Sequence, residues 1–331
     1  QNAYVDPPFA EGGVSCERCH GAGDRHAQSA RAADIVNPAK LDPVRRASVC
    51  NQCHLTGEFR VNLPGKGPET FRAGERLDSH IAVFIHESAP AGIAVTSHAE
   101  DLARSKCQPV WCGTCHSPHA SAVKPACTGC HQPSVCKSSG KGECVTCHMP
   151  RRNVRDADHV VFTDHSIPRR ARAPSRAASR LIPFPGSLAG EREVFLALAQ
   201  RALRDNTAAP PAPLIDDAEV LVYRAELHKR ANEYDKAVPL YEAALARDAH
   251  QVTAYAALGA IAMERGDAAG AVLHWRSALA RSPGLPLVRM NLALALLELG
   301  RMAEAAREID EVIRRSPALD AAYRLRERIR R

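Results

Sequence analysis

The apolar residues of the second half of the chain, from Ala218 onward, recur with the spacing expected of α-helices. This segment is rich in Ala, Leu, Arg and Glu, and its pattern repeats at an interval of about 34 residues. Small or apolar residues hold equivalent places in three successive copies: Ala225, Ala237, Tyr241 and Ala244; Gly259 (after Leu258), Ala271, Trp275 and Ala278; Ala293 (after Leu292), Ala305, Ile309 and Val312. Small side chains at such places let neighbouring helices approach closely, so the sequence predicts stacked pairs of helices.

This spacing is typical of the tetratricopeptide repeat, which forms an α-solenoid. We expect repeats at about residues 218–251, 252–285 and 286–319, then a capping helix over 320–331, with one more helix over 190–205. Stacked repeats form a concave groove that commonly holds a partner protein. Two roles stay open for this domain: docking of a partner, and capping of the first half of the chain or self-association.

The first half of the chain has no sustained period, and Gly and Pro interrupt it at high density. Within it, Gly74–His86 alternates poorly and is interpreted as a short helix. No apolar run in the sequence is long enough to span a membrane. We therefore predict a mainly α fold: a loop-rich domain over 1–168, a basic Arg/Pro-rich linker over 169–186 and a helical repeat domain over 187–331.

All twelve cysteines lie in the first half of the chain, and ten of them form five copies of C-x-x-C-H. Two thiols at this spacing lie on one face of a helical turn and can bond the two vinyl groups of one porphyrin, and the His is then the proximal iron ligand. A zinc site needs two such pairs, and a thioredoxin-like site needs a βαβ unit. We predict five covalently attached haem c groups, at Cys16, Cys19 and His20; Cys50, Cys53 and His54; Cys112, Cys115 and His116; Cys127, Cys130 and His131; and Cys144, Cys147 and His148. We expect these macrocycles to form most of the core of the domain.

Seven other histidines of this half are candidates for the sixth ligand of the irons: His26, His80, His86, His98, His119, His159 and His165. Met149 is the only methionine here, and it adjoins a proximal His, so bis-histidine ligation is the expectation. His119 follows His116 too closely to reach the far side of the same iron. It is therefore either a ligand of a different haem or a surface residue.

Four segments carry a resemblance to a known family: GVSCERCHGAGDRH, SHAEDLARSKC, CGTCHSPH, and CVTCHMP followed by HVVFTDHSI. They resemble multihaem cytochromes of the cytochrome c554-like superfamily that carry a C-terminal repeat domain. The resemblance implies that His80 and His86 are ordinary residues and that the distal ligands are His26, His98, His119, His159 and His165. In longer relatives earlier haem motifs precede the first segment, so this member either lost those haems or is trimmed.

The two remaining cysteines, Cys107 and Cys136, are either joined in a disulfide or are two buried free thiols. Haem attachment of this kind implies export, so we expect a periplasmic or extracellular protein. No signal peptide is visible, as expected of a mature or trimmed chain. The net charge is +7, and the Arg-rich stretch 169–180 is interpreted as a solvated linker or as a partner for haem propionates. Because that stretch lacks interleaved aromatic residues, we expect no nucleic-acid partner.

Three functional classes remain. The first is an electron carrier that serves redox partner proteins, with every iron six-coordinate and no catalytic residue. The second is an enzyme of the nitrite-reducing or hydroxylamine-oxidising kind, with one open haem site. The third is a subunit of a polymeric haem filament, in which a neighbouring chain supplies a ligand. The number of candidate histidines favours a carrier over an enzyme.

Overall fold

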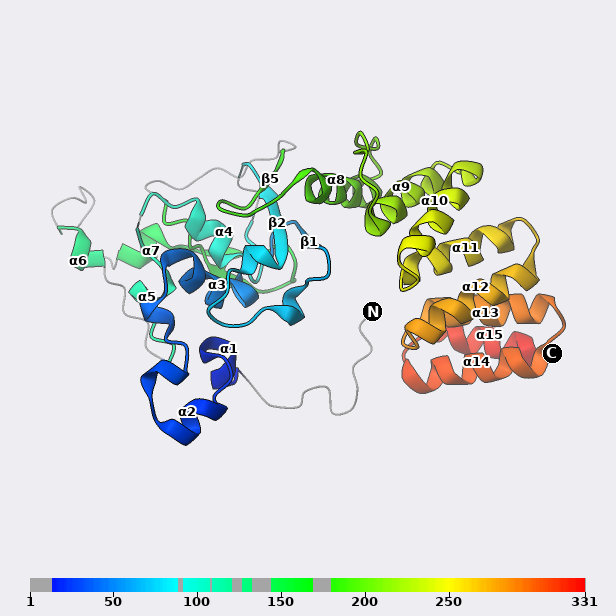
Figure 1. The fold of residues 1–331 in the computed structure, drawn as a ribbon, viewed down its shortest axis with the longest axis horizontal. Coiled ribbons are helices and arrows are strands. Elements are labelled where there is room, and N and C mark those ends of the chain that lie inside the picture. The colour runs from blue at the N-terminus through cyan, green and yellow to red at the C-terminus, as the bar shows by residue number, and fades with distance from the viewer. Residues whose placement is uncertain are drawn as a thin grey trace. The chain divides into compact units, whose positions relative to one another are not determined.

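The computed structural model describes residues 14–88, 92–107, 109–120, 127–132, 144–168 and 180–330, and it is mainly helical. The chain divides into two compact units (Figure 1). We call residues 13–197 the haem-motif unit and residues 198–330 the repeat unit. Among the described residues, no helix combines the length and the apolar character that a membrane span requires.

The haem-motif unit contains short helices joined by long connections: α1 (Cys16–His20), α2 (Asp24–Ser29), α3 (Pro43–His54), α4 (His98–Ala103), α5 (Cys112–Cys115), α6 (Cys127–Cys130) and α7 (Cys144–His148). The longest of them, α3, begins where Asp42 accepts hydrogen bonds from the backbone N–H groups of Val44 (3.0 Å) and Arg45 (3.1 Å). Pro43 occupies the first helical position, where no N–H is needed. In the described part of this unit there are also four single 3₁₀ turns: Ala32–Asp34, Pro38–Lys40, Pro68–Thr70 and Leu77–Ser79.

The strands of this unit form two small antiparallel sheets. The first has the order β1-β2-β5, with β1 (Phe59–Asn62), β2 (Ile81–His86) and β5 (Leu181–Pro183). The second pairs β3 (Arg151–Asn153) with β4 (Val161–Thr163). In the first sheet Phe59 lies opposite Phe84, and Phe84 in turn lies opposite Pro183.

The interpretation of Gly74–His86 as a short helix is wrong. Its first part contains only the 3₁₀ turn Leu77–Ser79, and its second part is the central strand β2. Five consecutive residues of β2, Ile81 to Ile85, are buried. A strand covered on both faces is continuously apolar and shows no alternation of apolar and polar residues. The lack of alternation was therefore wrongly interpreted as a helix.

A compact apolar core surrounds β2. Leu55, Phe71, Leu77, Ile81 and Val83 pack together there, and each is at most 6% exposed. Around this sheet the chain supplies its own core. This part of the unit therefore needs no haem to bury its apolar side chains.

The repeat unit is a run of antiparallel helices, each packed on the next (Figure 1). They are α9 (Ala218–Arg230), α10 (Tyr234–Arg247), α11 (Val252–Glu264), α12 (Ala268–Arg281), α13 (Pro286–Glu298), α14 (Met302–Arg315) and α15 (Asp320–Arg330). A further helix, α8 (Glu191–Asp205), crosses the division between the units. The residues at equivalent places in the repeat are fully or almost fully buried, among them Ala225, Tyr241, Trp275 and Ile309. The prediction of stacked helical repeats in this region is confirmed.

Candidate haem-binding site

Each C-x-x-C-H motif lies on one turn of helix. The motifs occupy α1, the C-terminal end of α3, α5, α6 and α7. In α5 and α6 the His follows the last helical residue, but its N–H still bonds the carbonyl of the first Cys, as in His116 to Cys112 and His131 to Cys127 (2.8 Å each). All ten motif cysteines are exposed or half-buried. Each motif therefore presents two thiols and one imidazole from a single turn, as covalent haem attachment requires.

The first three motifs lie close to one another. The thiols of Cys50 and Cys112 are hydrogen-bonded, and this bond, followed by burial, raises the pKa of Cys50. Burial, and then the neighbouring Cys53, raise the pKa of Cys19. Helices α1 and α3 are also in contact. Porphyrins attached at these motifs would therefore be neighbours.

Three of the motif histidines have a second imidazole beside them that comes from a distant part of the chain. Ring centroids are 5.8 Å apart for His20 and His119, 6.1 Å apart for His116 and His165, and 5.2 Å apart for His54 and His98. The planes of the first two pairs are nearly parallel, at 13° and 20°, and those of the third are at 86°. A metal–imidazole bond is about 2 Å long, so two imidazoles on opposite sides of one metal have centroids about 6 Å apart. The first two pairs fit this spacing and the third is somewhat closer, at 5.2 Å. Each pair joins a predicted proximal His to a predicted distal His.

Two of these pairs also touch each other. The rings of His98 and His165 lie 4.6 Å apart, edge to face. Burial, and then the neighbouring His165 and His54, lower the pKa of His98 to about 4. Burial also lowers the pKa of His165. Both histidines are thus held as neutral imidazoles, the form that binds a metal.

Several of the candidate ligands are oriented by a backbone carbonyl. The Nδ1 atom of His20 donates to the carbonyl of Val36 (2.8 Å), and that of His148 donates to Pro168 (3.0 Å). The same arrangement holds His26 against Arg31 (2.9 Å) and His165 against Thr163 (2.9 Å). A proton on Nδ1 leaves the lone pair of Nε2 available for a metal. A metal-binding His usually donates its other ring N–H to a carbonyl in this way. The donor set therefore fits haem iron.

His80 and His86 are engaged with protein groups instead. His80 is 4% exposed, and its Nδ1 is hydrogen-bonded to Thr70 Oγ1 (2.8 Å) while its Nε2 faces Glu75 Oε2 (3.0 Å). The Nε2 of His86 faces Glu58 Oε2 (3.5 Å). Both ring nitrogens of His80 are therefore engaged, whereas only Nε2 of His86 faces a protein group and its Nδ1 is buried without a hydrogen-bond partner among the described residues. Sequence spacing alone could not distinguish these two from the other candidates.

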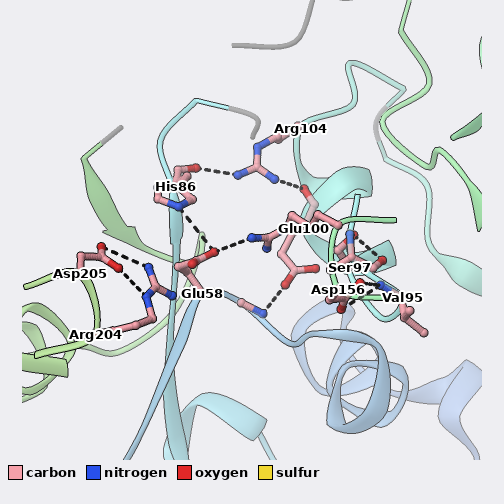
Figure 2. Close-up of polar contacts among 12 residues, drawn as sticks. Glu58, His86, Val95, Ser97, Glu100, Arg104, Asp156, Arg204 and Asp205 are labelled. Atoms are coloured by element: carbon pink, nitrogen blue, oxygen red, sulfur yellow. Dashed lines mark hydrogen bonds and ion pairs between the residues drawn. The ribbon is translucent and has the colours of Figure 1, made fainter. Parts of the chain in front are cut away.

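A polar network beside His86 holds helix α4, which carries His98 (Figure 2). Glu58 accepts a hydrogen bond from Arg155 (3.0 Å), and Arg104 at the end of α4 donates to the carbonyl of His86 (2.6 Å). Glu100, on the same helix, is 4% exposed and accepts from the backbone N–H of Gly57. These bonds tie α4 to β1 and β2 and so fix the place of His98. No sequence pattern predicts this network, because its members are spread over the whole unit.

The remaining predicted site residues either have no paired imidazole or lie partly outside the described residues. Among the described residues, no imidazole lies beside His131, and none lies beside His26 or His159. His131 and His159 are exposed. Cys107 is described, but Cys136 lies outside the described residues, so their pairing stays a prediction. The Arg-rich stretch also lies outside them, apart from Arg180, which faces Glu87 (3.1 Å).

Within the described ranges, no three His, Cys, Asp or Glu side chains converge on a point that would hold a bare metal ion. Haem iron needs fewer protein ligands than a bare metal ion. The porphyrin supplies four of its ligands, so that one or two imidazoles from the protein complete the site.

Two family comparisons cover most of the repeat unit. Tetratricopeptide repeat families match residues 224–286 and residues 262–329. These matches coincide with the helical pairs from α9 to α15. The C-terminal region belongs to the tetratricopeptide repeats. No curated protein matches the chain.

Solved structures of tetratricopeptide repeat domains are also similar to this region. The TPR domain of OM64 from Arabidopsis is 21% identical, with 34% of this chain and 93% of that chain covered and a TM-score of 0.33. The type III secretion chaperone SycD of Yersinia enterocolitica, in complex with a peptide of the translocator YopD, is 18% identical, with 34% and 91% covered and a TM-score of 0.32. MamA is 20% identical, with 42% and 70% covered and a TM-score of 0.33.

Proposed function

We propose that the haem-motif unit is a pentahaem c-type cytochrome domain that transfers electrons outside the cytoplasm, and that the tetratricopeptide repeats dock a partner protein. The five C-x-x-C-H motifs supply the attachment chemistry. The three imidazole pairs are the observation that carries the proposal, because chance folding would not bring a second His to each of three motif histidines at the spacing of an axial pair.

Bound haem supplies reversible one-electron chemistry at its iron. The residues of the chain determine how that chemistry is used. Cysteine thioethers fix each macrocycle, and His20, His54 and His116 provide the proximal nitrogens. His119, His98 and His165 would supply the second imidazole at these three sites and would keep water and small ligands away, which suits electron transfer rather than substrate binding. Two imidazole ligands also give lower potentials than a His/Met pair.

The order of the sites follows from the same contacts. The second and third motifs are neighbours, because the Cys50 and Cys112 side chains lie beside each other and the His98 and His165 rings are in contact. The first motif is joined to the third, because His119 follows His116 in one short turn and lies beside His20. Haems attached at these three motifs would therefore lie next to one another.

A filament subunit is the second candidate, and the exposed histidines favour it over an enzyme. His131 is exposed and has no imidazole beside it among the described residues, and the same is true of the predicted distal ligand His159. A ligand from a second copy would complete such a site. Mass photometry of the loaded protein tests this: discrete small particles support the carrier, and lengthening assemblies support the filament.

Electron paramagnetic resonance of the oxidised, haem-loaded protein tests the carrier proposal. We expect low-spin ferric signals from all five irons and no rapid binding of cyanide. A high-spin signal with rapid cyanide binding in the unmodified protein would instead indicate an open site and the enzyme class.

The docking role of the repeat unit is supported by its family and its architecture. Stacked repeats leave an extended concave surface, and this surface is the usual site of protein recognition in solenoids. A redox partner held there would remain near the covalently attached haem-motif unit throughout electron exchange.

A further inference from the structure

A single arginine beside the second and third haem motifs lacks an anionic partner. Arg46 lies on α3, one turn before Cys50. Its guanidinium carbon lies 4.7 Å from the centroid of the Trp111 ring, and Trp111 directly precedes Cys112. The Nε atom of Arg46 is buried and has no hydrogen-bond partner among the described residues.

Three other arginines of the chain have the carboxylate partner that Arg46 lacks among the described residues. The Nε atoms of Arg192 and Arg326 are also buried without a partner, but these guanidinium groups face Glu193 (3.1 Å) and Asp310 (3.8 Å) through another nitrogen. The neighbour Arg45 faces Asp42 (3.6 Å). In the described part of the chain, Arg46 has no carboxylate of this kind. Arg46 as a whole is half-buried, and a guanidinium partly withdrawn from water without an anion is costly, so a partner is expected.

The surroundings of Arg46 hold it in one orientation. Trp111 packs against Gly113 so closely that a Cβ atom at Gly113 would collide with the indole ring. The indole is therefore fixed, and it covers one face of the guanidinium. The edge of a stacked guanidinium stays available, and its fork of N–H groups matches a carboxylate in a bidentate manner.

The carboxylates that could meet this edge are those of the haem groups. The Cys50 and Cys112 thiols are hydrogen-bonded, so Arg46 and Trp111 lie at the junction of two attachment sites. Each haem brings two propionates. We propose that Arg46, held by Trp111, binds a propionate of the haem attached at Cys50 and Cys53 or of the one attached at Cys112 and Cys115. This inference rests on the proposed haem content.

The test compares variants of the full haem-loaded chain. Arg46→Gln removes the cation, and Arg46→Lys keeps a charge without the fork. Arg45→Gln is the matched control, since it removes the same charge from the preceding, exposed position of the helix. Removing a cation beside a haem favours the ferric state. In a potentiometric titration, Arg46→Gln should lower the midpoint potential of one haem, so that its ratio of reduced to oxidised iron at a fixed potential falls severalfold. Arg46→Lys should recover most of this shift, and Arg45→Gln should cause none.

Two further variants identify the haem that is affected. Combining Arg46→Gln with His98→Ala marks the second haem by a high-spin signal, and combining it with His165→Ala marks the third. A shift carried by either marked haem supports the proposal and names the propionate donor. Equal potentials for Arg46→Gln and Arg45→Gln, with all five haems present by mass, would overturn it. Absence of haem in the parent protein would instead overturn the proposed function.

Discussion

The imidazole rings of His20 and His119 lie 5.8 Å apart with their planes 13° from parallel, although one belongs to the first haem motif and the other follows the third. His119 cannot reach the iron held by its own motif, because Pro118 stiffens the turn that separates it from His116. One rigid turn thus presents an imidazole to each of two haem sites. This relationship links the first site to the third.

Replacing His119 with Ala should leave five covalent haems but convert one low-spin haem to high-spin. The affected haem should be the one attached at Cys16 and Cys19, because His20 would lose the imidazole opposite it. Electron paramagnetic resonance detects the change. If the additional changes Cys16→Ser and Cys19→Ser leave the high-spin signal in place, His119 serves another iron.

His80 provides the matched control for that variant. It is buried, and both of its nitrogens are engaged, by Thr70 and Glu75. His80→Ala should therefore lower the free energy of unfolding by about 1–3 kcal/mol, the usual cost of leaving buried polar groups unpaired. Its spectrum should remain low-spin, and a high-spin signal in this variant would make His80 a ligand.

The tetratricopeptide packing makes a prediction about Gly259 in α11. A Cβ atom there would lie 2.5 Å from the indole Nε1 of Trp275, and the indole cannot retreat easily because it donates to the carbonyl of Ala256 (3.1 Å). Gly259→Ala should destabilise the repeat unit by about 1–3 kcal/mol through overpacking. Gly284→Ala is the control, since its Cβ would meet no atom within 4 Å. Thermal denaturation followed by far-ultraviolet circular dichroism measures both, and equal melting temperatures would refute the packing argument.

Cys107 and Cys136 should be joined in the exported, oxidised protein. Alkylation under denaturing conditions without reductant should then modify neither residue, and alkylation after reduction should modify both. Peptide mapping by mass spectrometry distinguishes the two states. Modification of both thiols before reduction would show that they are free.

The accuracy of sequence reasoning differed between the two units for a physical reason. Contacts in the repeat unit are local, so the period that placed Ala237, Trp275 and Ile309 also determined which helices pack together. The haem-motif unit depends on contacts between residues far apart in the chain. The motifs predict haem attachment at Cys50 and Cys112, but no pattern could predict that their side chains lie beside each other.

The same limit applies to the candidate ligands. Spacing alone does not separate the seven candidate histidines, and only the family resemblance assigned His98 as a ligand and His86 as an ordinary residue. The fold adds a physical reason, since His98 lies beside His54 and His86 lies beside Glu58. Strand β2 was missed because burial on both faces removes the alternation that marks a strand. The sequence did not single out Arg46, because only the fold shows that its Nε atom is buried without a hydrogen-bond partner among the described residues.

The most direct test of the central claim is the intact mass of the protein, produced in a host that attaches haem c and measured under denaturing conditions. Thioether bonds survive these conditions, so only covalently held haem contributes. We predict the mass of the polypeptide plus five haems, one for each C-x-x-C-H motif. A mass that corresponds to four haems or fewer would contradict the account.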